Sequence, residues 1–365
     1  MSKLSIHLVV RNEEKYLPFL LVSLKRQTFK DFEIICVDNA STDNTIGVIK
    51  KELDEAGIKY TILKNEENIG FSGGHNQAFK LSSSPYILLQ NADMFLMPDC
   101  LEKMVNFLDI HTSAVALAPR LMRWNFERAS TALMNGSDLV DASREGFTSQ
   151  IDSIGISVFR NRRALEWLTK QEWAKDSESK EIRNIYNKPI KEVFGISGAS
   201  AMYRKKALDE IIASEENIFD STFHSYKEDL DLAYRLQNAG YISYILLDTV
   251  AYHDRTSAGP ESLGDISALK NKKRQSYFTR FYSYKNHLKT LYKNEYWQNF
   301  VLDFPFIFWY EFKKIVYLLF KDPKILFKSA VEIAKEFPRL REARESVIKN
   351  RRMHWKGIRR WLNYV

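Results

Sequence analysis

The first 120 residues alternate short β-branched runs with segments of helical period. Leu4–Val10 and Phe32–Val37 favour strands, and Glu13–Gln27 between them places its leucines on one helical face. Further strands and helices are expected at Lys59–Leu63, Tyr86–Leu89, Ala114–Ala118, Asn44–Ala56, Ser72–Leu81 and Pro98–Asp109. This alternation predicts βαβ units, and therefore an α/β fold with a mostly parallel central sheet flanked by helices.

In a sheet of this kind, ligands bind beyond the carboxyl ends of the parallel strands. Functional side chains are therefore expected just after Val10, Val37, Leu63 and Leu89. Catalytic and ligand-binding residues are therefore expected in the four short loops that follow these positions.

The chain changes character after this alternation ends. Arg123–Lys191 is polar and weakly periodic, which predicts a partly ordered excursion with a hairpin near Ile154–Phe159. Regular structure is expected again over Val193–Tyr203, in a helix that starts near Tyr226, and in a strand over Tyr241–Tyr252.

Long helical segments follow Pro260, each apolar and aromatic on one face and basic on the other. They are expected at Phe278–Tyr296, Phe304–Phe320 and Pro323–Phe337. The composition therefore predicts one domain over residues 1–260 and a helical appendage over residues 261–365. A chain that ends near Gly264 is expected to stay soluble and to keep the first domain's site.

The helical appendage is strongly basic. From Asp265 onward the chain has 23 Lys and Arg against 9 Asp and Glu, whereas the preceding part is net negative. Four tryptophans lie in the same stretch, and together these features indicate helices that lie on an anionic membrane surface. A merely solvated basic face, or packing against the first domain or a second subunit, as in a homodimer, stays open. No nucleic-acid module is recognisable, so nucleic acid is not an expected partner.

Three further features favour a reducing compartment without insertion into a bilayer. Cys36 and Cys100 stand in apolar contexts typical of reduced core thiols. A cleaved signal is not expected, because no basic region followed by a long apolar run opens the chain. No stretch reaches the roughly 18–20 uncharged apolar residues that span a bilayer. We expect a cytoplasmic protein that is peripheral on the inner face of the cell membrane.

Two segments after the early strands carry candidate ligand contacts. Asp38 ends a strand, where its carboxylate could accept a hydrogen bond from a base or ribose or simply cap the next helix. Asn68–Asn76 holds three glycines, which allow close approach of backbone to a ligand and free amide groups for a phosphate. A plain turn would use the same residues, so this segment alone does not distinguish a ligand-binding site from a turn.

Three later positions carry candidate acids and a metal ligand. Asp93 follows the fourth strand, with Asn91 two residues before it, and suits a divalent cation that holds a diphosphate. Glu228 and Asp229 open a helix, where acids stabilise the N-terminus or serve as a general base. His253 ends a strand, where a lone histidine is more often a packing residue than a ligand. An ordinary loop acid remains the plain alternative for Asp93.

In chain order, these pieces resemble the family-2 inverting glycosyltransferases with the A-type, Rossmann-like fold, and among them the rhamnosyltransferase-like members. The resemblance runs from about Leu4 to Ser257 and is weak over Arg123–Lys191. The segments that carry it are Val37–Asp43, Asn68–Asn76, Asn91–Asp93, Gly198–Met202, Phe223–Gly240, and His253 with Ser257.

The resemblance implies roles for individual residues. It implies that Asp38 binds a pyrimidine, that Asp93 and His253 hold a divalent cation, Mg²⁺ or Mn²⁺, and that Asp229, beside Glu228, is the catalytic base. Nucleotide-sugar contacts are implied at Val9, Arg11, Asp38, Gly73, Asn76, Asn91 and Asp93.

The implied activity is transfer of a sugar, with inversion, from a nucleotide-diphosphate donor to a saccharide acceptor, lipid-linked, in cell-surface polysaccharide assembly. The resemblance favours dTDP-rhamnose, while other members use UDP-sugars. Many members carry Asp where this chain has Asn91, which leaves the strictness of metal dependence open. The alternative is a catalytically inactive sugar-nucleotide-binding or scaffold protein.

Overall fold

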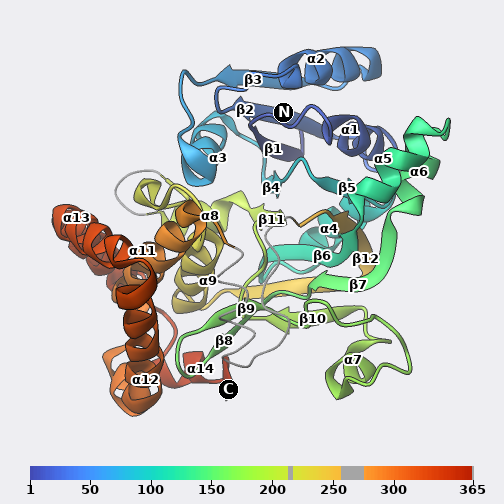
Figure 1. The fold of residues 1–365 in the computed structure, drawn as a ribbon. Helices are drawn as coiled ribbons and strands as arrows, with labels where there is room; N and C mark the ends of the chain where they lie inside the picture. Colours follow the sequence, from blue (N-terminus) through green and yellow to red (C-terminus); the bar gives the residue numbers. More distant parts are fainter. Residues whose placement is uncertain (213–216, 256–274, 364–365) are drawn as a thin grey trace.

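The computed structural model describes residues 1–212, 217–255 and 275–363. Ser257, at the end of the motif series, and the expected domain boundary after residue 260 lie outside the described residues. Figure 1 shows a central sheet with helices on its faces and the C-terminal helices gathered at one end.

The N-terminal half of the sheet is parallel, as the alternation predicts. Its strands β1 (Leu4–Val10), β2 (Phe32–Asp38), β3 (Tyr60–Lys64) and β4 (Tyr86–Gln90) lie in the order β3-β2-β1-β4. β1 is buried on both faces because helices cover the sheet from both sides. The connecting helices are α1 (Leu17–Lys25), α2 (Thr45–Ala56) and α3 (Gly70–Leu81).

The second half of the sheet mixes strand directions. β11 pairs antiparallel with both β4 and β6, and β12 runs parallel to β6. β5 and β10 add to β12, and β7 adds to β6. The bounds of these and the neighbouring elements are β5 (Met94–Leu96), α4 (Cys100–Ile110), β6 (Ala114–Trp124), α5 (Phe126–Met134), α6 (Leu139–Glu145), β7 (Phe147–Ser153), α7 (Lys180–Ile185), β10 (Ile190–Val193), β11 (Ser200–Arg204), α8 (Lys205–Ile211), α9 (Glu228–Asn238) and β12 (Ile242–His253).

The segment Arg123–Lys191 corrects the expectation of partial order. It contributes α5, α6, β7 and α7, together with the hairpin of β8 (Ile156–Phe159) and β9 (Ala164–Glu166). The hairpin itself is confirmed near Ile154–Phe159. The periodicity is weak because these elements are short, from three to nine residues each.

The C-terminal region consists of α11 (Tyr277–Asn294), α12 (Trp297–Lys321), α13 (Pro323–Lys349), α14 (Trp355–Arg359) and β13 (Leu362–Asn363). It is joined to the rest of the chain by strand pairing and buried charges. β13 pairs with β8, and the α11 residues Lys293 and Asn294 bond to Asp231 of α9 at 3.0 and 2.8 Å. Part of the appendage therefore packs on the first domain, one of the alternatives that the sequence leaves open.

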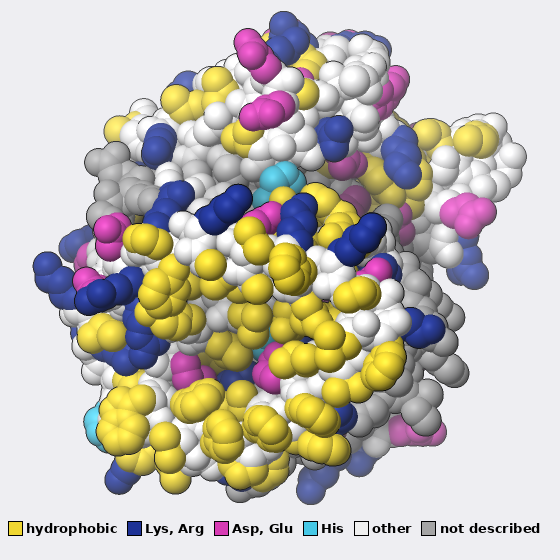
Figure 2. Space-filling model, turned by 60° about the vertical axis from the view of Figure 1, so that its left-hand side comes forward, with side chains coloured by type: hydrophobic (Ala, Val, Ile, Leu, Met, Phe, Trp, Pro, Cys, Tyr) yellow, Lys and Arg dark blue, Asp and Glu magenta, His cyan; other side chains and the backbone are white. Residues whose placement is uncertain are grey.

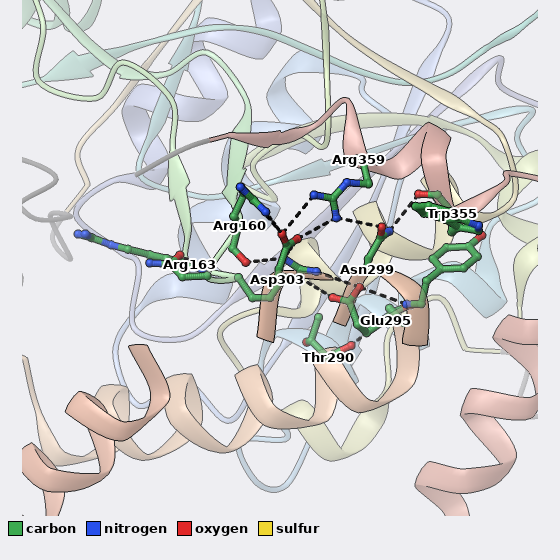
Figure 3. Close-up of polar contacts among 12 residues, drawn as sticks. Arg160, Arg163, Thr290, Glu295, Asn299, Asp303, Trp355 and Arg359 are labelled. Carbon is green, nitrogen blue, oxygen red and sulfur yellow. Dashed lines mark hydrogen bonds and ion pairs between the residues drawn. The ribbon is translucent and has the colours of Figure 1, made fainter. Parts of the chain in front are cut away.

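A second link joins α12 to the β8 hairpin. Figure 3 shows Arg160 and Arg359 converging on Asp303 of α12. The fully buried Arg162 donates to the same carboxylate at 3.0 Å and to Glu295 at 2.5 Å. Because three guanidinium groups share this one buried acid, α12 has a fixed position on the hairpin.

Candidate functional site

Asp38 stands at the carboxyl edge of β2, where the sequence places it. Its side chain is buried, and one carboxylate oxygen accepts a hydrogen bond from the Ser41 amide at 3.0 Å. The next residue, Asn39, donates to the Gly70 carbonyl and accepts from Asn65. Asp38 therefore shapes the turn after β2 and lies at the sheet edge where a nucleoside would bind.

The glycine-rich segment is mostly helix, because α3 begins at Gly70. A Cβ on Gly70, whose φ is +79°, would lie 2.4 Å from the His224 carbonyl oxygen, and one on Gly74 would lie 2.7 Å from Val9. These two glycines therefore let α3 approach neighbouring parts of the protein. Gly73 is partly exposed within α3, where a Cβ would meet Ile69 at 3.0 Å.

Asn76 departs from the expected ligand contact. Its side chain is buried, and its amide donates to the Phe219 carbonyl and accepts from the Phe219 amide, both at 2.9 Å. These paired bonds give Asn76 a bracing role between α3 and the segment before α9, and we do not count it among the proposed contacts. Arg11, in contrast, is exposed directly after β1.

The structure brings Asp93 and His253 together although 159 residues separate them in the sequence. Pairing of β5 with β12 places the Asp93 carboxylate 3.4 Å from Nε2 of His253. The Nδ1 atom of His253 lies 2.8 Å from the buried carboxylate of Asp152. Burial alone would lower the pKa of His253, but the charges of Asp93 and Asp152 prevail and raise it to about 9.

These donors fit a divalent cation that is shared with a diphosphate. Asp152 fixes the imidazole so that Nε2 faces the Asp93 carboxylate, the arrangement usual for a metal-bound histidine. Within the described ranges no cluster of three or more His, Cys, Asp or Glu is arranged as a metal site. Asp93 and His253 are the two candidate ligands in this part of the chain, and phosphate oxygens of a bound diphosphate would add to them. Asn91 is partly exposed two residues before Asp93.

Glu13 is a further acid of this region that the sequence did not reveal. Burial and the nearby charge of Asp93 raise the pKa of its carboxyl group to about 7. It precedes α1, which begins at Leu17 and not at Glu13 because Pro18 fits only the first turn of a helix. Glu13 therefore stays in the loop at the sheet edge.

Glu228 and Asp229 open α9 after a strained loop. His224, Tyr226 and Lys227 have φ values of +60°, +71° and +72°, a conformation that non-glycine residues rarely adopt. Burial and the neighbouring Asp229 raise the pKa of Glu228 to about 8. Burial and the charge of Glu166 also raise the pKa of Asp229. Carboxyl groups with pKa values raised in this way are typical of functional sites.

The acid pair lines a cavity of about 900 Å³. The β8 hairpin region supplies Glu166 and Trp167 to its wall, and the C-terminal residues Trp361 and Asn363 supply another part. A cavity of this volume accommodates a saccharide-sized ligand.

Arg255 connects this cavity to the Asp93–His253 pair. Its guanidinium contacts Asp152 at 2.9 Å and Glu166 at 3.1 Å. Asp152 in turn holds His253, so one chain of charged groups joins both parts of the site. The sequence offered a signal only for Arg255, which follows His253 by two residues. Asp152 and Glu166 lie in the weakly periodic segment and belong to no motif.

Three comparisons with known proteins show what this chain is similar to. Residues 5–136 match the family model described as glycosyl transferase family 2. Among curated proteins, the poly(ribitol-phosphate) beta-N-acetylglucosaminyltransferase TarS of Staphylococcus aureus (strain Mu50) is 33% identical over 120 residues, which cover 32% of this chain and 21% of TarS. The uncharacterized glycosyltransferase YfnE of Bacillus subtilis (strain 168) is 23% identical over 290 residues, 73% of this chain and 68% of YfnE.

Among solved structures, GalNAc-T7 with UDP, GalNAc and Mn²⁺ superposes with a TM-score of 0.55 at 11% identity. The match covers 80% of this chain and 49% of GalNAc-T7. The Staphylococcus aureus TarS structure gives a TM-score of 0.45 at 17% identity and covers 95% of this chain and 54% of that one. In the sequence comparison, the chain spans about a fifth of the length of the curated relative TarS.

Proposed function

From a chain whose residues 5–136 form a glycosyltransferase family 2 domain within a GT-A fold, we propose an enzyme that transfers a sugar from a nucleotide-diphosphate donor to a saccharide acceptor with inversion. The observation that carries this proposal is the Glu228–Asp229 pair, which lines a cavity of about 900 Å³. Arg255 ties that cavity to the Asp93–His253 pair. The proposed base and the proposed leaving-group site are thus linked by a continuous series of charged side chains.

The donor side of the proposal rests on the carboxyl edge of the parallel strands. Asp38 would recognise the pyrimidine there, and Arg11 and Asn91 directly follow the neighbouring strands β1 and β4. Val9 within β1 and Gly73 within α3 are the further proposed contacts. The rhamnosyltransferase-like resemblance favours dTDP-rhamnose, whereas the activity named for TarS is transfer of N-acetylglucosamine. Both donor classes share the pyrimidine and the diphosphate.

The residues then divide the chemistry between them. Asp229 removes the proton as an acceptor hydroxyl attacks the anomeric carbon from the face opposite the leaving nucleoside diphosphate. A divalent cation on Asp93 and His253 would offset the negative charge that develops on this leaving group. Burial, followed by the charge of Asp229, raises the pKa of Glu228 and so favours its protonated form. The arrangement needs no covalent intermediate on the protein.

We also propose that the acceptor is lipid-linked and that the protein lies on the inner face of the cell membrane, in cell-envelope polysaccharide assembly. Figure 2 shows hydrophobic side chains gathered over the face that carries the C-terminal helices, with Lys and Arg around them. Among the helices of the described ranges, none has the length and apolar content that crossing a bilayer requires. Interfacial binding through aromatic and basic side chains accounts for such a surface.

The test is a thermal-shift panel of dTDP-rhamnose, UDP-glucose, UDP-galactose and UDP-N-acetylglucosamine, each with and without Mn²⁺. A donor that binds only the folded state raises the melting temperature, and the shift should be larger with Mn²⁺. The preferred donor should then be turned over in the presence of a lipid-linked acceptor. Donor binding without any turnover would favour the inactive binding protein, and no shift with any nucleotide sugar would refute the proposal.

A further inference from the structure

Lys227 is a basic residue of the large cavity that no step of the proposed reaction involves. It immediately precedes the Glu228–Asp229 pair, and its side chain lines the same cavity of about 900 Å³. Within the described residues, this partly buried side chain makes no hydrogen bond or ion pair. Its positive charge therefore acts on the groups around it through space and not through a bonded contact.

The loop that carries Lys227 is held in a strained conformation by α11. Lys227 has a φ of +72°, in the left-handed region that favours glycine. The amide nitrogen of Asn286, a fully buried residue of α11, lies 2.8 to 3.0 Å from three carbonyl oxygens of this loop, those of Phe223, Ser225 and Tyr226. Strained backbone persists only where the surrounding structure determines it. The position of Lys227 before α9 is therefore fixed.

The two acids that follow Lys227 differ in the hydrogen-bond donors that reach them. The Asp229 carboxylate accepts a hydrogen bond from the Leu230 amide at 2.7 Å and another from the Gly198 amide. Oε2 of Glu228 is buried and has no partner among the residues that the structure describes. Backbone N–H donors stabilise an ionised carboxylate, whereas burial without donors favours the protonated form. The negative charge of the pair therefore belongs on Asp229 and the proton on Glu228.

Several charges face Asp229 from the elements packed around it. Burial raises the pKa of Asp229 most, followed by the charge of Glu166 on β9, whereas the charge of Lys227 lowers it. Glu166 itself contacts Arg255 at 3.1 Å. The buried Tyr203 of β11 also faces Asp229, and burial, followed by the Asp229 charge, raises the pKa of its hydroxyl. Lys227 thus supplies positive charge against the effects of burial and of Glu166.

On its other side, Lys227 faces basic groups. It also lines a smaller cavity between α11 and α12, together with Arg163, His287 and Lys314. Glu311 contacts His287 at 2.7 Å and Lys314 at 3.0 Å. Burial lowers the pKa of the Lys227 side chain, and the charges of the acid pair and of the cavity's other acid on β9 oppose this shift. Attraction between Lys227 and the acids is therefore mutual.

We propose that Lys227 is a positioning residue for the proposed base: its ammonium charge keeps the Asp229 carboxylate ionised, so that the proton of the acid pair stays on Glu228. The acceptor hydroxyl then loses its proton to Asp229, and Glu228 takes no part in this transfer. This inference rests on the proposed function and explains why the second acid of the pair, and not the first, is the base.

The experiment follows the carboxyl carbon of Asp229 by NMR in the full-length protein labelled with γ-¹³C aspartate, without donor or acceptor. Its resonance is the one that Asp229→Asn lacks. In Lys227→Met, which removes the charge and keeps an unbranched side chain, the titration midpoint should move to higher pH. Lys227→Arg should restore the wild-type midpoint. Should Lys227→Met fail to fold, Lys227→Gln carries the same expectation.

Lys191→Met is the matched control. Lys191 lines the same cavity from β10, where its ammonium group lies 5.8 Å from the ring centroid of Trp167. The same substitution at this position should leave the Asp229 midpoint as in wild type. An unchanged midpoint in Lys227→Met, or an equal shift in Lys191→Met, would overturn the proposal.

Turnover gives a second readout, measured as nucleoside diphosphate release from the donor that the thermal-shift panel selects. The kcat of Lys227→Met should fall about tenfold near pH 6 and recover as the pH rises, because fewer molecules carry the ionised base at low pH. A loss of turnover that is equal at every pH would indicate a structural role and overturn the proposal. A shifted midpoint in a protein that turns over no donor would instead overturn the proposed function, and with it the catalytic role of Lys227.

Discussion

The protonation of two adjacent carboxyl groups decides the chemistry of this site. Asp229→Asn removes the proposed base but keeps an oxygen that can accept the Leu230 amide bond of 2.7 Å. We therefore expect an unchanged melting temperature and a turnover about 10² to 10⁴ lower, the usual contribution of a general base. Initial rates of nucleoside diphosphate release measure this. Unchanged turnover would transfer the role to Glu228.

The raised pKa of Glu228 makes a separate prediction about stability. Its pKa rises from 4.5 to about 8 through burial and the charge of Asp229, with Lys227 opposing. Between these pH values the folded protein binds more protons than the unfolded chain, so stability falls as pH rises. Glu228→Gln cannot ionise, and its melting temperature should gain on that of wild type from pH 5 to pH 8. A constant difference across this range would contradict the buried, protonated carboxyl group.

At the residue scale, the sequence alone could locate side chains that directly follow a predicted strand. It could not locate side chains whose partners lie far away in the sequence and meet them only through pairing of strands. Asp93 and His253 meet at 3.4 Å, as the resemblance implied. Asn76 belongs to the same motif as Gly73 but is occupied by the backbone of Phe219. Asp152 carried no signal, because its partnership with His253 depends on pairings across the sheet and not on local spacing.

At the scale of elements, the buried Asp303 cluster is expected to determine how firmly the C-terminal helices are held. Asp303 is fully buried and faces Arg160, Arg162 and Arg359. Asp303→Ala leaves these charges without their shared partner and should lower the free energy of unfolding by about 3 to 5 kcal/mol. Urea denaturation measures the change. Glu345→Ala, which breaks an exposed pair with Arg341, should cost less than about 1 kcal/mol.

The ends of helices and strands could be predicted where neighbouring residues in the sequence determine them. β1 was expected at Leu4–Val10 and is found there, because this short run is rich in Leu, Ile and Val and is followed by polar residues from Arg11 onward. The helix α13 was expected to end at Phe337 but continues through Pro338 to Lys349. Local helix propensity disfavours a proline inside a helix and so predicts an end before Pro338, but in the structure the helix continues past this residue.

For the whole molecule, contacts between the C-terminal helices and the preceding residues predict that a chain ending near Gly264, which the sequence led us to expect to stay soluble, does not fold stably. The fully buried Arg162 has its acidic partners Glu295 and Asp303 in the missing part. Asp231 would lose Lys293 and Asn294. Stranded buried charges are strongly destabilising. The truncated chain should therefore show no cooperative thermal transition by circular dichroism, whereas a cooperative one would restore the division at residue 260.

At the same scale, we propose that the aromatic and basic surface of α12 contacts a membrane. Phe308 and Trp309 are 55% and 58% exposed on α12, and the exposed Lys321 and Lys324 lie beyond them. The protein should sediment with anionic phosphatidylglycerol vesicles at low salt and be partly released at high salt, because each basic residue near the surface contributes only about 1 kcal/mol of screened attraction. Phe308→Ser with Trp309→Ser should abolish sedimentation and leave donor binding intact, since neither ring is part of the core. Met134→Ser, at a side chain 83% exposed on α5, is the control and should sediment like wild type. If the double variant still sediments, these two rings are not the membrane contact. If the wild-type protein does not sediment, the aromatic face meets a protein surface, and the acceptor is to be sought among soluble saccharides.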